Sequence, residues 1–190
     1  MSGVDDATIL LVPGLRDHVP NHWQTYLAGE LPNSVTVEPL TERRLSRAAR
    51  VAALDAMLRS IKGDVVIVAH SAGVLMVAHW ALAPTRRIRG ALLATPADVE
   101  LPLPKGYPTF EELETNGWLP IPRGRLPFPS ILAASRNDPL CMAAKAAELA
   151  AAWGSELVDA SAVGHLNPAS GFGPWPEARG LLDRLKMAAC

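Results

Sequence analysis

Short apolar runs and amphipathic segments alternate along the chain, and this alternation restricts the fold more than any other feature. The apolar runs have the length of buried strands, and several are rich in valine or isoleucine. They are Thr8–Val12, Ser34–Glu38, Val65–Ala69, Gly90–Thr95, Ser130–Ser135 and Glu156–Ala160. Strands that alternate with helices are joined by right-handed crossovers and form a mostly parallel sheet with helices on both faces. The sequence therefore predicts an α/β fold with about six strands.

The segments between the runs repeat apolar residues at helical spacing. In Leu45–Ile61, the side chains of Val51, Leu54 and Leu58 share one helix face. The other predicted helices are Trp23–Leu31, Val74–Leu82, Met142–Trp153 and Glu177–Leu185, with a weaker signal at Thr109–Thr115. A chain of 190 residues has the length of one compact domain, so we expect residues 1–190 to form a single domain.

Composition and charge exclude several classes of protein. Hydrophobic residues make up 49% of the chain and charged residues 19%, which is typical of a folded globular protein. The net charge of -1 offers no field that would recruit nucleic acid. The apolar runs are far shorter than the ~20 residues of a membrane span. Residues 1–6 are acidic, whereas a secretory signal peptide begins with basic residues. We expect a cytoplasmic protein without nucleic-acid or membrane partners.

The sequence gives no sign of a metal or cofactor. Its two cysteines, Cys141 and Cys190, are too few for a disulfide framework and lack metal-ligand spacing. His18 and His22 stand four apart without a third ligand. No glycine-rich nucleotide-binding motif follows the first strand, so we predict no metal and no cofactor. A basic run of Arg43, Arg44, Arg47 and Arg50 is interpreted as a solvated helix face.

The third apolar run leads directly into a helix through His70-Ser71-Ala72-Gly73, which is the pattern of a nucleophile elbow. Such a tight strand-to-helix turn needs small residues two positions before and after the nucleophile, and Ala69 and Gly73 meet that need. Ala69 replaces the first glycine of the G-x-S-x-G pattern. The alternative is that Ser71 is merely an N-cap of the helix.

A nucleophilic serine needs an imidazole to accept its proton and an acid to orient that imidazole. In this type of fold the acid and the histidine follow the serine, each in a loop after a later strand. Asp138 and His165 occupy two such loops, 67 and 94 residues after Ser71. Asp98 is the main alternative acid, because it follows the strand after the nucleophile helix. Glu100 is a weaker candidate for the same role.

Two backbone N–H groups are needed to hold the developing oxyanion. Ala72, directly after the serine, is predicted to supply one of them. The first strand ends in Val12-Pro13-Gly14, and Leu15 is predicted to supply the second, with Arg16 as an alternative donor.

Residues 96–129 separate two predicted strands and contain eight of the 17 prolines. Connections of this length are often lids or functional loops. We therefore expect this segment to line a substrate pocket, with Arg16 as a further pocket residue. The candidates within the segment are Phe110, Trp118, Leu119 and Ile121.

With these residues identified, the chain resembles the small YdeN-like serine hydrolases of the α/β-hydrolase superfamily, the group that includes retinoblastoma-binding protein nine. The likeness covers nearly the whole chain. It is carried by Val12-Pro13-Gly14, Asn21-His22-Trp23-Gln24, the elbow around Ser71, Ala94–Val99, Leu126–Pro129, Ser135–Pro139, Gly164–Asn167 and Ser170–Glu177. The resemblance implies a single-domain α/β-hydrolase without a large cap domain, and a catalytic triad of Ser71, Asp138 and His165.

The sequence thus predicts a serine hydrolase that cleaves a small ester, thioester or amide through an acyl-serine intermediate. A small acyl compound is the expected partner, and the oligomeric state stays open. Two alternatives stay open as well. A protein of this fold can serve as an interaction module without strong catalysis, or it can transfer the acyl group to an acceptor other than water.

Overall fold

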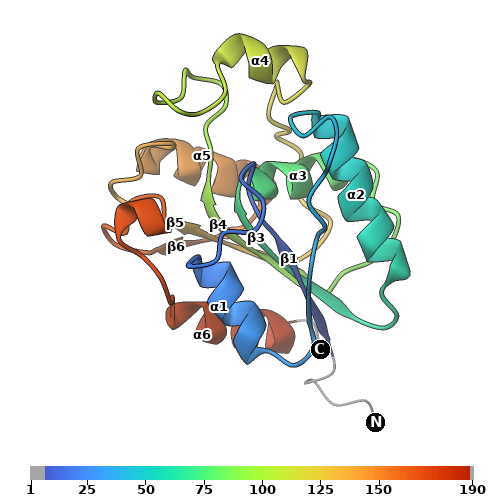
Figure 1. The fold of residues 1–190 in the computed structure, drawn as a ribbon. Coiled ribbons are helices and arrows are strands. Elements are labelled where there is room, and N and C mark those ends of the chain that lie inside the picture. Colours follow the sequence, from blue (N-terminus) through green and yellow to red (C-terminus); the bar gives the residue numbers. More distant parts are fainter. Residues whose placement is uncertain (1–6, 189–190) are drawn as a thin grey trace.

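The computed structural model describes residues 7–188, which form a six-stranded parallel sheet in the order β2-β1-β3-β4-β5-β6 (Figure 1). The strands are β1 (Thr8–Val12), β2 (Ser34–Thr36), β3 (Val65–Ser71), β4 (Gly90–Pro96), β5 (Ser130–Ala134) and β6 (Glu156–Asp159). The predicted fold class and strand number are therefore confirmed. The acidic residues 1–6 and Cys190 lie outside the described residues.

Strand ends differ from the predicted ends by two residues or fewer. β3 and β4 run further than predicted because their pairing continues through a register shift to Ser71 and Pro96. β2 is shorter than predicted and ends at Thr36, although the Val37 N–H still donates to the Leu11 carbonyl. These extensions and losses all fall at the carboxyl ends of the strands, where the sheet gives way to loops.

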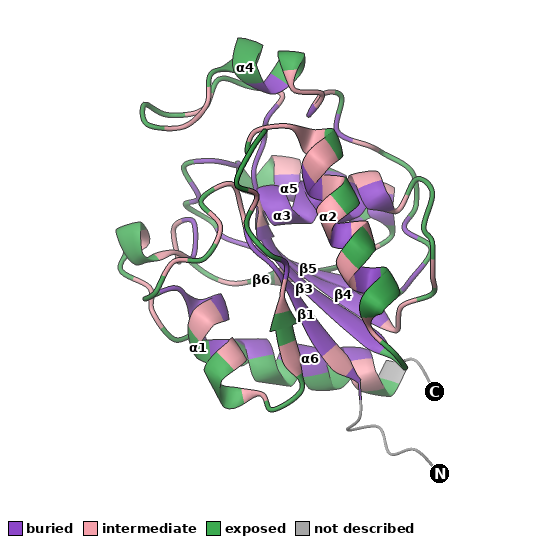
Figure 2. Cartoon of the chain, turned by 45° about the vertical axis from the view of Figure 1, so that its right-hand side comes forward, coloured by how far each residue is buried: buried purple, intermediate pink, exposed green. Residues whose placement is uncertain are grey.

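Helices cover both faces of the sheet (Figure 1). On one face α1 (Trp23–Glu30) and α6 (Glu177–Ala188) pack on alternate strand residues such as Ile9, Val66 and Leu92. On the other face α2 (Arg47–Ser60), α3 (Ala72–Trp80) and α5 (Ala143–Trp153) pack on the residues between them, such as Leu10, Ile67 and Leu93. Because successive strand side chains point to opposite faces, a strand covered on both sides is apolar throughout. Figure 2 shows the central strands fully buried.

Several helices begin or end at residues that favour a helix terminus. The Ser46 hydroxyl accepts a hydrogen bond from the Ala49 N–H at the start of α2. Thr109 and Glu112 form a capping box that starts α4 (Phe110–Thr115). α5 ends at Gly154, which adopts the left-handed conformation that glycine accommodates without steric cost. None of the helices within residues 7–188 is long and apolar enough to cross a membrane.

The strand order determines where a site can form. The chain adds β2 on one side of β1 and then continues from β3 on the other side, so the direction of winding reverses between β1 and β3. Ligands of open parallel sheets bind at such a reversal, beyond the carboxyl ends of the strands. Here the loop after β1 and the turn after β3 meet at that edge.

Candidate active site

Ser71 lies in a sharp turn between β3 and α3, with a positive φ of 57°. Non-glycine residues rarely adopt this conformation, and it occurs where a functional side chain is held out from a sheet. A Cβ atom at Gly73 would lie 2.2 Å from the Val12 carbonyl oxygen, so no larger residue fits there. Ala69 is completely buried, which explains why the other flanking position must also be small.

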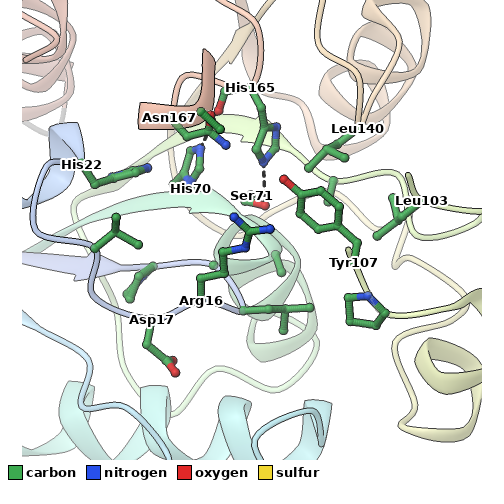
Figure 3. A pocket seen from close by; sticks show the side chains of 18 of the residues that line it. Arg16, Asp17, His22, His70, Ser71, Leu103, Tyr107, Leu140, His165 and Asn167 are labelled. Carbon is green, nitrogen blue, oxygen red and sulfur yellow. Dashed lines mark hydrogen bonds between the residues drawn. The ribbon is translucent and has the colours of Figure 1, made fainter. Parts of the chain in front are cut away.

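The alternative in which Ser71 is only a helix cap is wrong, because its side chain caps no backbone N–H of the described residues. Its hydroxyl instead lies 2.8 Å from Nε2 of His165. Figure 3 shows this hydrogen bond at the pocket surface.

His165 joins Ser71 to Asp138. Its Nδ1 lies 2.9 Å and 3.0 Å from the two carboxylate oxygens of Asp138. Both side chains are buried, with His165 only 3% exposed. An ionised carboxylate accepts hydrogen bonds and does not donate them, so Nδ1 carries the proton. The Nε2 atom of the neutral ring then accepts a hydrogen bond from the Ser71 hydroxyl. This arrangement can move a proton away from Ser71.

Asp98 does not contact His165. Its carboxylate accepts a hydrogen bond from the Glu100 N–H at 3.1 Å, and its own N–H donates to the Leu140 carbonyl. Asp98 thus ties its loop to the loop that carries Asp138. Glu100 lies in an ion cluster with Arg123 and Lys145, and the Arg123 guanidinium lowers the pKa of Glu100 to about 2.

Asn137 holds the acid loop and the histidine loop together, a role that the sequence analysis missed. Its side-chain oxygen accepts hydrogen bonds from the Ser135 hydroxyl and from the Gly164 N–H. On the other side of the histidine loop, the Ser170 hydroxyl accepts a hydrogen bond from the His165 N–H at 3.0 Å. These contacts position His165 from both neighbouring segments. The sequence signal that could have indicated this role is that Asn137 directly precedes Asp138 and that Gly164 directly precedes His165.

His70 packs beside the site without contacting Ser71 through its ring. Its Nε2–H donates to the His165 carbonyl at 2.9 Å, and the two rings lie 4.9 Å apart. The His22 ring packs on the other edge of His70. Burial lowers the pKa of His70 well below its ordinary value and lowers that of His22 to about 4. Both rings are therefore neutral near pH 7, and His70 supports the backbone of the histidine loop.

The loop after β1 lies against Ser71. A Cβ atom at Gly14 would lie 3.1 Å from Cβ of Ser71, so glycine permits this close approach. The next residue, Leu15, makes no hydrogen bond through its N–H to another described residue. The Ala72 N–H is at the start of α3, where helix N–H groups lack an intrahelical partner. Both residues line the pocket beside Ser71.

Arg50 is buried, so the interpretation of the whole basic run as a solvated face is wrong at this position. Its guanidinium donates to the Leu15 carbonyl at 3.1 Å and forms an ion pair with Asp17 at 2.8 Å. Asp17 also pairs with the exposed Arg44. The helix α2 thereby holds the loop after β1 in place. The sequence pattern could not reveal this because Asp17 and Arg50 are distant in the chain.

The pocket has a volume of about 370 Å³ and opens at the carboxyl edge of β1 and β3. Its lining includes Arg16, as predicted, together with Ser71 and His165. Leu103 and Tyr107, from the connection between β4 and β5, form its outer side (Figure 3).

Trp118, Leu119 and Ile121 do not line this pocket, and neither does Phe110. Trp118 is completely buried in the core, where its indole N–H donates to the Leu45 carbonyl. Ile121 is also in the core, and the partly buried Leu119 packs against that core. The segment after α4 turns inward to cover α2 and α3, and this buries the large apolar side chains that the sequence suggested for the pocket. Among residues 7–188, no group of three or more His, Cys, Asp or Glu side chains is arranged to hold a metal.

Comparison with known proteins shows the family and the fold of this chain. A sequence model of the serine hydrolase family matches residues 9–184. The crystal structure of a protein described as a YdeN-like hydrolase, from Pectobacterium atrosepticum, is 30% identical, with a TM-score of 0.82 over 98% of this chain and 94% of that chain.

Two more distant structures share the fold. The ydeN gene product of B. subtilis is 15% identical, with a TM-score of 0.70 over 94% of this chain and 98% of that one. A carboxylesterase from Bacillus cereus is 14% identical, with a TM-score of 0.57 over 99% of this chain and 91% of that chain. Among curated proteins, none matches the sequence. Since the family match spans nearly all of the described residues, the chain belongs to the serine hydrolase family, among its YdeN-like members.

Proposed function

We propose that this protein hydrolyses a small ester, thioester or amide through an acyl-serine intermediate, with Ser71, His165 and Asp138 as its catalytic triad. The observation that carries the proposal is the continuous hydrogen-bonded path from the Ser71 hydroxyl through His165 to the Asp138 carboxylate. The apolar pocket of about 370 Å³ beside Ser71 has room for a small acyl group.

In the first step, Ser71 Oγ attacks the substrate carbonyl carbon while its proton moves to Nε2 of His165. Asp138 accepts the Nδ1–H hydrogen bond and stabilises the imidazolium that forms. The carbonyl oxygen becomes an oxyanion, and the N–H groups of Leu15 and Ala72 donate to it. Because these groups are backbone donors on a positioned loop and a helix start, they need little reorganisation during the reaction.

The tetrahedral intermediate then collapses. The bond to the leaving group breaks, and the leaving group takes the proton from Nε2 of His165. The neutral imidazole next removes a proton from a water molecule, which attacks the acyl-serine carbonyl. Breakdown of this second intermediate releases the carboxylic acid and returns the proton to Ser71.

Covalent labelling tests the proposal directly. A fluorophosphonate probe is expected to label the wild-type protein at Ser71, and p-nitrophenyl butyrate is expected to be hydrolysed. Ser71→Ala should abolish labelling and lower kcat by about 10⁴- to 10⁶-fold. Ser60→Ala, which removes an exposed hydroxyl at the end of α2, is the matched control and should be labelled normally.

Circular dichroism and the thermal midpoint would show that both variants are folded. A folded wild-type protein that is neither labelled nor active would instead favour an interaction role. Undiminished hydrolysis by Ser71→Ala would show that the nucleophile is wrongly assigned.

A further inference from the structure

Arg16 lies at the mouth of the pocket that contains Ser71 and His165. Gly14, two residues earlier, approaches Ser71 so closely that a Cβ atom there would lie 3.4 Å from the Ser71 hydroxyl oxygen. Consecutive Cα atoms are 3.8 Å apart, so the Arg16 backbone is within about 7.6 Å of Gly14. Ser71 and Arg16 both line this pocket, so a ligand that fills it can reach both side chains.

The Arg16 guanidinium has no acidic partner among the described residues, unlike its neighbours. Arg44 and Arg50 both pair with Asp17, at 2.9 Å and 2.8 Å. The contact that orients Arg16 is the face of the Tyr107 ring, whose centroid lies 4.9 Å from the guanidinium carbon. Figure 3 shows these two side chains extending toward each other. Stacking on a ring face leaves the N–H groups at the edge of the guanidinium available to a ligand.

The charge at the pocket mouth is positive. The fixed charges that line the pocket are those of Arg16, Arg44 and Asp17. The single carboxylate is already shared between Arg44 and Arg50. The remaining lining is mostly apolar, and the buried rings of His22 and His70 are neutral near pH 7. An uncharged acyl group would use the apolar lining but would leave the Arg16 guanidinium without a partner.

We propose that Arg16 binds a carboxylate on the substrate, so that the preferred substrates are acid-bearing esters, thioesters or amides. This inference rests on the proposed hydrolase function and specifies its substrate class. The planar guanidinium matches a carboxylate through two parallel N–H to oxygen hydrogen bonds. Stacking on Tyr107 restricts the rotamers of Arg16 before the substrate binds, which lowers the entropy cost of forming those bonds.

Because Arg16 is exposed at the mouth, solvent weakens the attraction, and the expected preference is about tenfold rather than several powers of ten. Leu15, the proposed oxyanion donor, immediately precedes Arg16. The bound carboxylate therefore lies near the scissile carbonyl, on either its acyl side or its leaving-group side.

Two matched pairs of esters test the proposal and distinguish these sides. The first pair is the mono-p-nitrophenyl ester of adipic acid and its methyl ester, which differ by a charge on the acyl side. The second pair is 3-butyryloxybenzoate and its methyl ester, which differ by a charge on the leaving group. For wild type, kcat/KM is expected to be about tenfold higher for the acid in one pair, and salt near 0.5 M should reduce the preference.

Arg16→Gln should remove this preference, and Arg16→Lys should retain part of it through its charge. Arg87→Gln is the matched control, because Arg87 is an exposed arginine outside the pocket. It should keep the wild-type ratio. A wild-type enzyme that hydrolyses both members of each pair equally would overturn the proposal. So would an acid preference that survives in Arg16→Gln.

A binding measurement separates this inference from the proposed function. Calorimetry on Ser71→Ala is expected to show tighter binding of monomethyl adipate than of dimethyl adipate. The difference should be lost when Arg16→Gln is added. This result supports Arg16 as an anion-binding residue even if labelling of Ser71 fails. Equal binding of the two compounds to Ser71→Ala would overturn the Arg16 proposal while leaving the triad proposal standing.

Discussion

The two sides of the pocket are built differently. On the catalytic wall, Ser71 and His165 are connected by a hydrogen bond, and Asp138 lies buried behind them. On the recognition wall, the exposed Arg16 makes a cation–π contact with the half-buried Tyr107, and the half-buried Leu103 lines the same side of the pocket. The first wall lies at the carboxyl ends of β3, β5 and β6, whereas the second consists of two connecting loops.

This difference separates reaction from selection. Directional hydrogen bonds among buried groups allow one arrangement, so a change in the catalytic wall should slow the reaction with every substrate. Under the proposed function, loop residues on the recognition wall would contact parts of the substrate that do not react. Changes there should alter the ratio between substrates and leave the common chemistry in place.

After Ser71→Ala, the largest expected effect is that of changing the acid of the catalytic wall. Asp138→Asn should lower kcat by about 10⁴-fold, because an amide can donate to His165 Nδ1 and favour the wrong tautomer. Asp98→Asn should have little effect, since the asparagine oxygen can still accept the hydrogen bond from the Glu100 N–H. Steady-state kinetics with one neutral ester compares the two variants. A larger loss for Asp98→Asn would reverse the assignment of the acid.

Trp118→Ala tests the boundary between recognition wall and core. Trp118 is completely buried, so its truncation should lower the free energy of unfolding by about 3–5 kcal/mol. Because Trp118 does not line the pocket, the ratio of kcat/KM for long and short acyl esters should stay unchanged. Urea denaturation and an ester series measure the two quantities. A changed ratio without loss of stability would return Trp118 to the recognition wall.

His22→Asn tests how burial at the pocket floor affects stability in acid. The pKa of His22 is lowered from 6.5 to about 4 by burial and by the neighbouring His165 and His18. The unfolded chain therefore takes up a proton below about pH 6.5 that folded His22 does not, and stability falls until about pH 4. The contribution of His22 to this loss is about 3 kcal/mol.

Asparagine keeps an oxygen that can accept the helix-capping hydrogen bond from the Gln24 N–H. Urea denaturation at about pH 7 and pH 4.5 should therefore show a smaller acid loss in His22→Asn than in wild type. His18→Asn changes an exposed histidine that is the smallest of the three causes lowering the pKa of His22, so its acid loss should stay close to that of wild type. Equal acid losses in wild type and His22→Asn would contradict the role of burial.

The smallest expected effect is that of Leu103→Ala on the recognition wall. This change removes apolar surface from the pocket, so a longer acyl chain should lose binding energy, by up to about 0.8 kcal/mol in total. The ratio of kcat/KM for hexanoyl and acetyl p-nitrophenyl esters should fall a few-fold. A uniform fall for both esters would place Leu103 in the catalytic wall instead.

The helices and strands were predictable because a strand buried on both faces of a parallel sheet is apolar at successive positions, and this pattern is visible in the local sequence. Val65–Ala69 is apolar throughout, which predicts a buried strand, and its extension to Ser71 depends on the pairing with β4. Ser71, His165 and two alternative acids were predictable from their order along the chain, since parallel strands deliver their following loops to one edge, but order did not decide between Asp98 and Asp138. The pocket residues were not predictable in the same way. Trp118 and Leu103 both lie in one proline-rich connection, and local pattern does not reveal which of them turns inward.

By itself the sequence determined the parallel α/β architecture, the strained turn at Ser71 and the separate loops that carry Asp138 and His165. These features depend on hydrophobic periodicity and on small residues at fixed spacing, which are local properties. Tertiary structure alone decided that Asp138 rather than Asp98 contacts the histidine, that Arg50 is buried against Asp17, and that Arg16 faces Tyr107 without an acidic partner. Those outcomes depend on distances between segments far apart in the chain, which only the packing of the helices and loops on the sheet establishes.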